Sequence, residues 1–76
     1  MRKFFLYPNP TNGIFIIKGE DLNMVEVYNT TGQLVVTRTV SDGFAEIDLS
    51  NAAKGLYLVR AMSGKETMIE RKIVKN

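Results

Sequence analysis

The sequence of 76 residues contains no cysteine, no histidine and no tryptophan. Without cysteine the chain can form no disulfide and no thiolate metal site. Without histidine it lacks the commonest general base and the commonest metal ligand, so its serine and threonine hydroxyls have no imidazole to activate them. These absences argue against nucleophilic catalysis and against zinc-finger or thiol chemistry.

Long apolar runs and strong charge bias are missing too. No run reaches the roughly 18 apolar residues of a membrane-spanning helix, and the apolar stretch after Arg2 and Lys3 ends at Tyr7, too early for a signal peptide. The net charge is only +2, with weak excesses of positive charge at the two ends of the chain. Nucleic-acid binding needs a basic stripe with interleaved aromatic residues, which this sequence does not have.

The sequence does contain a series of short strand patterns separated by turn signals. The strongest pattern covers residues 55–60, where apolar residues on both faces predict a central strand covered on both sides or nearly so. A helical pattern also fits the last segment, but a strand is favoured there because a hairpin turn precedes it and Ile73 and Val74 are β-branched. Further strands are predicted at residues 4–7, 14–18, 23–29, 33–40, 44–49 and 66–75, and turns at 11–13, 19–21, 30–32, 41–43 and 62–65.

Short strands with frequent turns and no convincing helix are typical of a small antiparallel β-sandwich. We therefore predict an all-β fold of about seven short strands, immunoglobulin-like (Ig-like) in architecture. The cysteine pair and tryptophan of a true antibody domain are absent, so the similarity is architectural only. At this length residues 1–76 form one domain at most, and such a chain buries only about 60% of the surface that its unfolded form exposes.

Five motifs occur along the chain in a characteristic order and spacing. They are Tyr-Pro-Asn-Pro-Thr-Asn-Gly-Ile-Phe at 7–15, Val-Glu-Val-Tyr-Asn at 25–29 followed by Gly32, Ile-Asp-Leu-Ser at 47–50, Lys-Gly-Leu-Tyr-Leu-Val at 54–59 and Arg-Lys-Ile-Val-Lys at 71–75. Together they resemble the C-terminal sorting domain of cargo proteins of the type IX secretion system of Bacteroidetes. The resemblance covers residues 6–75. One departure is Ala52-Ala53, where this family more often has a leucine and a proline.

The resemblance implies a targeting module, here a single sorting domain detached from its cargo, with no catalysis and no cofactor. Such domains carry exported proteins from the periplasm through an outer-membrane translocon. A sortase-like peptidase then commonly removes them, and the cargo is attached to anionic lipopolysaccharide at the cell surface or released outside the cell. The implied partners are translocon and shuttle components and that peptidase, with no nucleic acid and no small-molecule substrate.

The last motif of the resemblance is the first candidate for recognition. A partner can pair with the edge strands or the tail of a β-sandwich by strand addition, whereas the alternative is a solvated edge strand guarded by lysines. We expect deletion of residues 73–76 to abolish export while most of the sandwich stays folded. The domain is expected to be a monomer, or a dimer that exchanges its last strand. The candidate residues are Arg71, Lys72, Ile73, Val74 and Lys75.

The remaining motif residues are expected to shape the fold, although those of the first motif could also take part in recognition. Prolines and glycines restrict or extend the range of φ, and a core tyrosine needs a partner for its hydroxyl. These residues are Pro8, Asn9, Pro10, Gly13, Gly32, Gly55 and Tyr57.

Two pairs of acidic residues and two other functions are the remaining alternatives. Glu46 and Asp48 share one strand face, roughly 6–7 Å apart, but the chain is too small to offer a glycosidase cleft. Turn residues Asp21 and Asp42 lack the spacing of a calcium loop. The main alternative function is a carbohydrate-binding or adhesive module of an exported enzyme, for which Tyr7 and Tyr28 are the only plausible stacking tyrosines. A structural spacer is the second alternative function.

Overall fold

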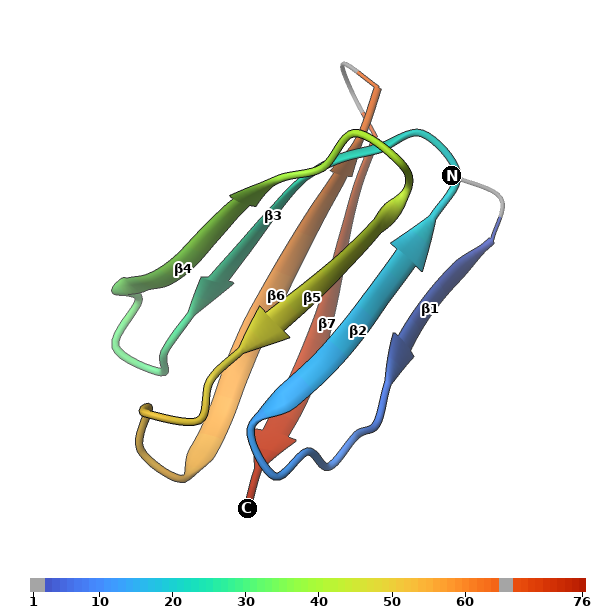
Figure 1. The fold of residues 1–76 in the computed structure, drawn as a ribbon. Helices are drawn as coiled ribbons and strands as arrows, with labels where there is room; N and C mark the ends of the chain where they lie inside the picture. Colours follow the sequence, from blue (N-terminus) through green and yellow to red (C-terminus); the bar gives the residue numbers. More distant parts are fainter. Residues whose placement is uncertain (1–2, 65–66) are drawn as a thin grey trace.

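The computed structural model describes residues 3–64 and 67–76, and these form two antiparallel sheets packed face to face (Figure 1). The three-stranded sheet has the order β1 (Phe4–Tyr7), β2 (Ile14–Gly19), β5 (Phe44–Asp48). The four-stranded sheet has the order β4 (Leu34–Thr39), β3 (Leu22–Tyr28), β6 (Gly55–Ser63), β7 (Thr67–Lys75). The predicted small antiparallel β-sandwich is confirmed. The described part of the chain has no helix long and apolar enough to cross a membrane.

The core lies between the sheets and is filled by alternate residues of their strands. Ala45 and Ile47 of β5 and Val25 and Val27 of β3 point inward, as the period-2 alternation of these segments predicts. Burial of each large aliphatic side chain contributes about 1.5–3 kcal/mol relative to leaving it exposed. The completely buried hydrophobic residues are Phe15, Ile17, Val25, Val27, Ile47, Val59, Ala61 and Ile73.

The strand predicted at residues 55–60 is central, because β6 lies between β3 and β7. The prediction that both of its faces are covered is wrong. Tyr57 and Val59 face the core, whereas Leu56 and Leu58 face outward and Leu56 is 41% exposed. The three-stranded sheet covers only the inner face of the four-stranded sheet, so the outward leucines contribute to an open apolar surface.

The predicted turn at residues 62–65 is also partly wrong, since β6 continues through Ser63. Ser63 is buried, and its hydroxyl donates a hydrogen bond to the Glu20 carbonyl oxygen at 3.0 Å, which extends the strand. The remaining predictions there, for Lys65 and Glu66, lie outside the described residues, as do those for Met1 and Arg2.

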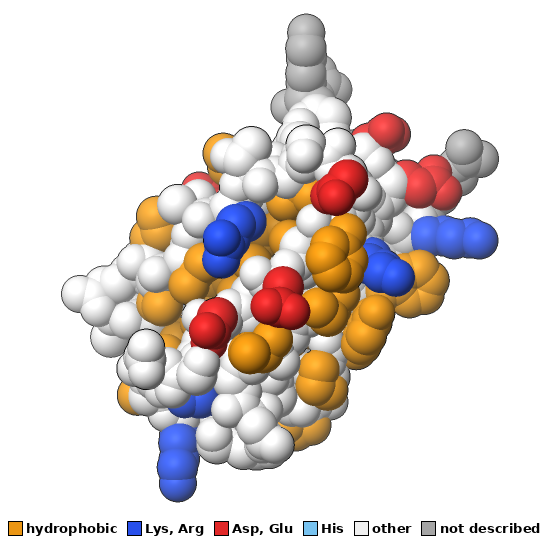
Figure 2. Space-filling view, viewed as in Figure 1, with side chains coloured by type: hydrophobic (Ala, Val, Ile, Leu, Met, Phe, Trp, Pro, Cys, Tyr) orange, Lys and Arg blue, Asp and Glu red, His pale blue; other side chains and the backbone are white. Residues whose placement is uncertain are grey.

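The outer face of the three-stranded sheet also exposes apolar side chains, beside the charged Lys18, Glu46 and Asp48. Phe5, Tyr7, Ile14 and Phe44 are all exposed on it, and Figure 2 shows hydrophobic side chains gathered over these strands. Lys18 lies between two of them in register, with its Nζ 5.9 Å from the centre of the Phe44 ring.

The loop that precedes β2 turns tightly at Gly13, where φ is 149°. A Cβ at this position would lie 3.0 Å from the Cα of Ser50, a tight contact that the Ser50 backbone could relieve only by shifting a few tenths of an ångström. Gly32, in the β3–β4 turn, also has positive φ, but a Cβ there would meet nothing within 4 Å.

We therefore expect Gly13→Ala to lower the free energy of unfolding by about 3 kcal/mol, since it adds a backbone clash to the conformational strain. Gly32→Ala, the matched control, should cost only about 1 kcal/mol. Urea unfolding of both variants measures this, and equal losses would contradict the close approach of Gly13 to Ser50.

Candidate functional site at the C-terminal strand

The five predicted recognition residues all lie on β7, but the strand divides them between two faces. Ile73 and Lys75 are buried and face the core, and Arg71 lies on the same side of the strand. Lys72 and Val74 are exposed on the outer face of the four-stranded sheet. The basic side chains therefore do not form one cluster.

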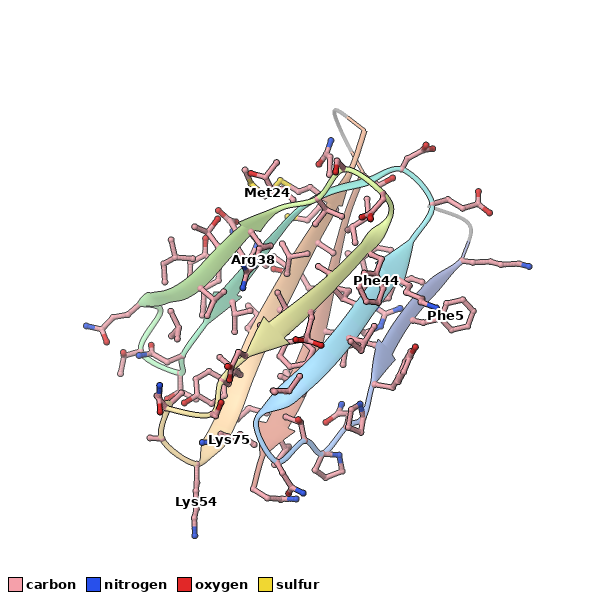
Figure 3. All side chains as sticks on the ribbon, viewed as in Figure 1. Phe5, Met24, Arg38, Phe44, Lys54 and Lys75 are labelled. Atoms are coloured by element: carbon pink, nitrogen blue, oxygen red, sulfur yellow. The ribbon has the colours of Figure 1, made fainter. Side chains whose placement is uncertain are left out.

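Lys75 is held inside the molecule by the loop between β5 and β6. Its ammonium group donates hydrogen bonds to the carbonyl oxygens of Ser50 at 3.1 Å and Ala52 at 2.5 Å. Figure 3 shows the contrast with Lys54, which points away from the molecule. The Lys75 charge also has a small effect on Asp48, whose pKa is lowered mainly by hydrogen bonds from the side chain and backbone of Ser50.

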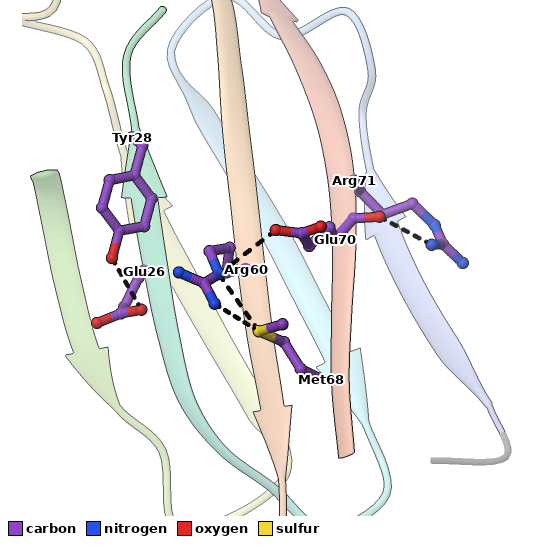
Figure 4. A network of polar contacts seen from close by, with 6 residues as sticks. All are labelled: Glu26, Tyr28, Arg60, Met68, Glu70 and Arg71. Carbon is purple, nitrogen blue, oxygen red and sulfur yellow. Dashed lines mark hydrogen bonds and ion pairs between the residues drawn. The ribbon is translucent and has the colours of Figure 1, made fainter. Parts of the chain in front are cut away.

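Arg71 lies at the side of the sandwich where the edges of the two sheets meet. Its guanidinium carbon is 5.3 Å from the centre of the Phe4 ring of β1, within the range of a cation–π contact. One of its nitrogens also donates a hydrogen bond to the Glu70 carbonyl oxygen at 3.0 Å (Figure 4). Arg71 thus joins β7 to the edge strand of the other sheet.

The outer edge of β7 is paired with the segment that follows β1. The Asn9 side chain donates from Nδ2 to the Lys72 carbonyl oxygen at 3.0 Å and accepts from the Val74 amide at 3.1 Å. The Thr11 amide donates to the Val74 carbonyl oxygen at 2.8 Å, and the Asn76 amide donates to the Thr11 carbonyl oxygen at 2.9 Å. Residues 9–11 therefore run along residues 72–76 in place of a further strand.

The anchor of this segment is Thr11, which is almost completely buried. Its hydroxyl donates to the Ile14 carbonyl oxygen at 2.7 Å and accepts from the Gly13 amide at 3.1 Å. The peptide bonds that precede Pro8 and Pro10 are both cis. The first motif of the chain is thus built against the last.

This pairing changes what a C-terminal deletion would do. Removal of residues 73–76 takes away the completely buried Ile73, the Lys75 hydrogen bonds and most of the pairing with residues 9–11. Loss of a large aliphatic side chain from the core alone costs about 2–5 kcal/mol. The expectation that most of the sandwich stays folded after the deletion is therefore not supported by the structure.

Tyr57 and Gly55 lie at the start of β6. Tyr57 is buried, and its hydroxyl donates to the Ala53 carbonyl oxygen at 2.5 Å. Gly55 is the first residue of the strand and has a φ of 139°. The hydroxyl contact fixes the loop ahead of β6, next to the carbonyl group that Lys75 binds.

Sequence reasoning missed a hollow on the outer face of the four-stranded sheet. It has a volume of about 440 Å³, and we call it the tail groove because β7 forms one side of it. Its lining residues are Tyr28, Asn29, Thr30, Gly32, Leu56, Tyr57, Leu58, Arg60, Glu70 and Lys72. The only sequence signal for it was the pair of outward leucines in residues 55–60, which suggested two-sided burial instead.

A row of paired polar groups crosses the sheet at one end of the tail groove (Figure 4). Arg60 Nε lies 3.4 Å from Glu70 Oε2, and its guanidinium carbon lies 5.8 Å from the centre of the Tyr28 ring. The Tyr28 hydroxyl in turn donates to Glu26 Oε1 at 3.1 Å, and Arg60 donates to the Met68 sulfur.

The family model for the secretion system C-terminal sorting domain matches residues 5–76. The chain belongs to this family. It is therefore a C-terminal secretion signal of the type IX system, and the protein that carries it is exported across the outer membrane. A comparison with curated protein sequences finds no match.

The acidic residues considered as catalytic or calcium-binding candidates do not form one cluster in this sorting domain. Glu46 and Asp48 are exposed on the outer face of β5, as the alternation of the strand predicts. Asp21 and Asp42 lie in turns, and within residues 3–64 and 67–76 no three His, Cys, Asp or Glu side chains are close enough to hold a metal ion.

The buried Lys75 predicts a measurable difference between two lysines of the sorting domain. We expect Lys75→Met to lower the free energy of unfolding by about 1–3 kcal/mol, because two carbonyl groups lose a charged donor. Lys54→Met removes an exposed charge and should change it by less than about 0.5 kcal/mol. Chemical denaturation compares the two, and equal values would show that the Lys75 hydrogen bonds contribute nothing.

Proposed function

We propose that the sorting domain directs a cargo protein fused ahead of it through the type IX translocon, and that shuttle and translocon components bind the folded sandwich. The supporting observation is the position of the tail. Residues 72–76 are paired with β6 on one edge and with residues 9–11 on the other. A partner that meets the folded domain therefore reaches the outward side chains of this segment and little of its backbone.

The positions of the chain ends fit this role. The chain enters β1 at the end of the sandwich that carries the β6–β7 hairpin, and the C-terminus lies at the opposite end (Figure 1). A cargo attached ahead of β1 thus leaves the tail accessible. Release of that cargo by a sortase-like peptidase requires a cut ahead of Phe4, because from there on the chain belongs to a sheet. The released cargo would then be attached to lipopolysaccharide at the outer-membrane surface or leave the cell.

The test is surface delivery of a fluorescent reporter that carries a periplasmic signal peptide at its start and residues 1–76 at its end. We expect fluorescence at the surface or in the medium of a strain with an intact type IX system, and none in a translocon-deficient strain. Reporter that stays in the periplasm in both strains would contradict the targeting function.

Substitutions at two neighbouring residues test whether the transport apparatus recognises the folded domain. Phe15→Ala leaves a cavity in the core and lowers the free energy of unfolding by about 3–5 kcal/mol, whereas Ile14→Ala changes an exposed side chain at the adjacent position. We expect Phe15→Ala to abolish delivery although residues 71–76 are unchanged, and Ile14→Ala to leave it intact. Normal delivery of a Phe15→Ala domain that circular dichroism shows to be unfolded would mean that the tail is read as a linear sequence.

A second candidate, glycan binding, is favoured by one observation. Phe5, Tyr7 and Phe44 are exposed on a single face, where aromatic rings could stack on sugars. Tyr28 lies on the other sheet, so it cannot form one platform with Tyr7. Glycan-array binding that is lost in Phe44→Ala, together with a reporter that is not delivered, would favour this function over targeting. Delivery of cargo that lacks the whole domain would instead favour a spacer.

A further inference from the structure

We propose that the tail groove binds an apolar segment of a partner protein, and that a carboxylate of this segment pairs with Lys72. The inference rests on the proposed function, because the partner would belong to the transport apparatus. It adds which surface of the domain the partner contacts and which chemical groups of the partner bind there.

The apolar lining of the groove comes from adjacent positions on β3 and β6, and the exposed Val74 of β7 lies beside it in register. Tyr28 pairs in register with Leu58, and Leu58 pairs with Lys72. In the next row Leu56 pairs with Val74, and both of these side chains are 41% exposed. The β3–β4 turn stands beside these rows and makes the surface concave. A concave surface with contiguous exposed apolar side chains is typical of an interaction site.

The charges on this face determine which charge the binding group of the partner carries. Glu26, Arg60 and Glu70 form one row across the sheet, where Arg60 lies between the two carboxylates in register and contacts Glu70. Lys72 lies in the adjacent, apolar row. Within the described ranges, no hydrogen bond or ion pair involves its ammonium group. A partner carboxylate at this position would therefore gain a charge-assisted hydrogen bond without breaking an existing pair.

The edge of β7 beside the groove determines how the partner approaches. Asn9 and Thr11 already pair with the outward backbone groups of Lys72 and Val74. Strand addition at these residues is therefore blocked. The partner must lie over the face of the sheet and contact the side chains of Leu56, Leu58 and Lys72.

The reporter fusion described above tests this inference with two matched pairs of variants. Leu56→Ser is compared with Ile14→Ser, an aliphatic residue that is 49% exposed on the outer face of the other sheet. Lys72→Glu is compared with Lys18→Glu, a lysine that is exposed on that same outer face. Lys72→Arg keeps the charge. Equal thermal midpoints of the purified domains establish that all five variants fold.

We expect Leu56→Ser and Lys72→Glu each to reduce delivered fluorescence about tenfold, the change that a tenfold weaker partner complex produces when binding limits transport. Both control variants and Lys72→Arg should stay within about twofold of the unmodified domain. Unchanged delivery of Leu56→Ser and Lys72→Glu would overturn the inference while the targeting function stands. Loss of delivery confined to Ile14→Ser and Lys18→Glu would overturn it by placing the partner on the three-stranded sheet. Failure of the unmodified reporter would refute the targeting function itself.

Discussion

The rest of the structure depends on the pairing of residues 9–11 with the end of β7. It joins a segment that follows the edge strand of one sheet to the edge strand of the other, and so closes one side of the sandwich. The same end of β7 contributes Ile73 to the core and the Lys75 ammonium group to the β5–β6 loop. The C-terminal segment is therefore held from three directions.

Local patterns predicted most of the strands but not what covers them. The period-2 alternation in β3 and β5 matches the division of their side chains between the two faces, because this period is a property of the backbone. The outward leucines of β6 led to the wrong prediction that both faces of this strand are covered. An apolar side chain on a strand does not reveal whether a second layer or only solvent lies above it. Burial of that kind is decided by the tertiary arrangement.

The contacts of the candidate site were less accessible to sequence reasoning. Asn9 binds backbone groups 63 and 65 residues away, and its own neighbourhood shows only turn chemistry. The last motif was assigned to a strand correctly, yet the division of its charges between two faces follows from the direction in which β7 packs. The tail groove needs β3, β6 and β7 in register, and that register is set by the whole sheet. A short C-terminal motif of a sorting domain can thus be one strip of a larger folded surface.

Amide hydrogen exchange at Val74 tests most directly whether residues 9–11 hold the C-terminal segment. The Val74 amide donates to the Asn9 side chain, whereas Asn12 is a neighbouring exposed asparagine in the same loop. In Asn9→Ala the Val74 amide should exchange about fivefold faster than in the unmodified domain, since a lost hydrogen bond is worth roughly 1 kcal/mol. In Asn12→Ala its rate should not change. Equal Val74 protection in all three proteins would contradict the central role of this pairing.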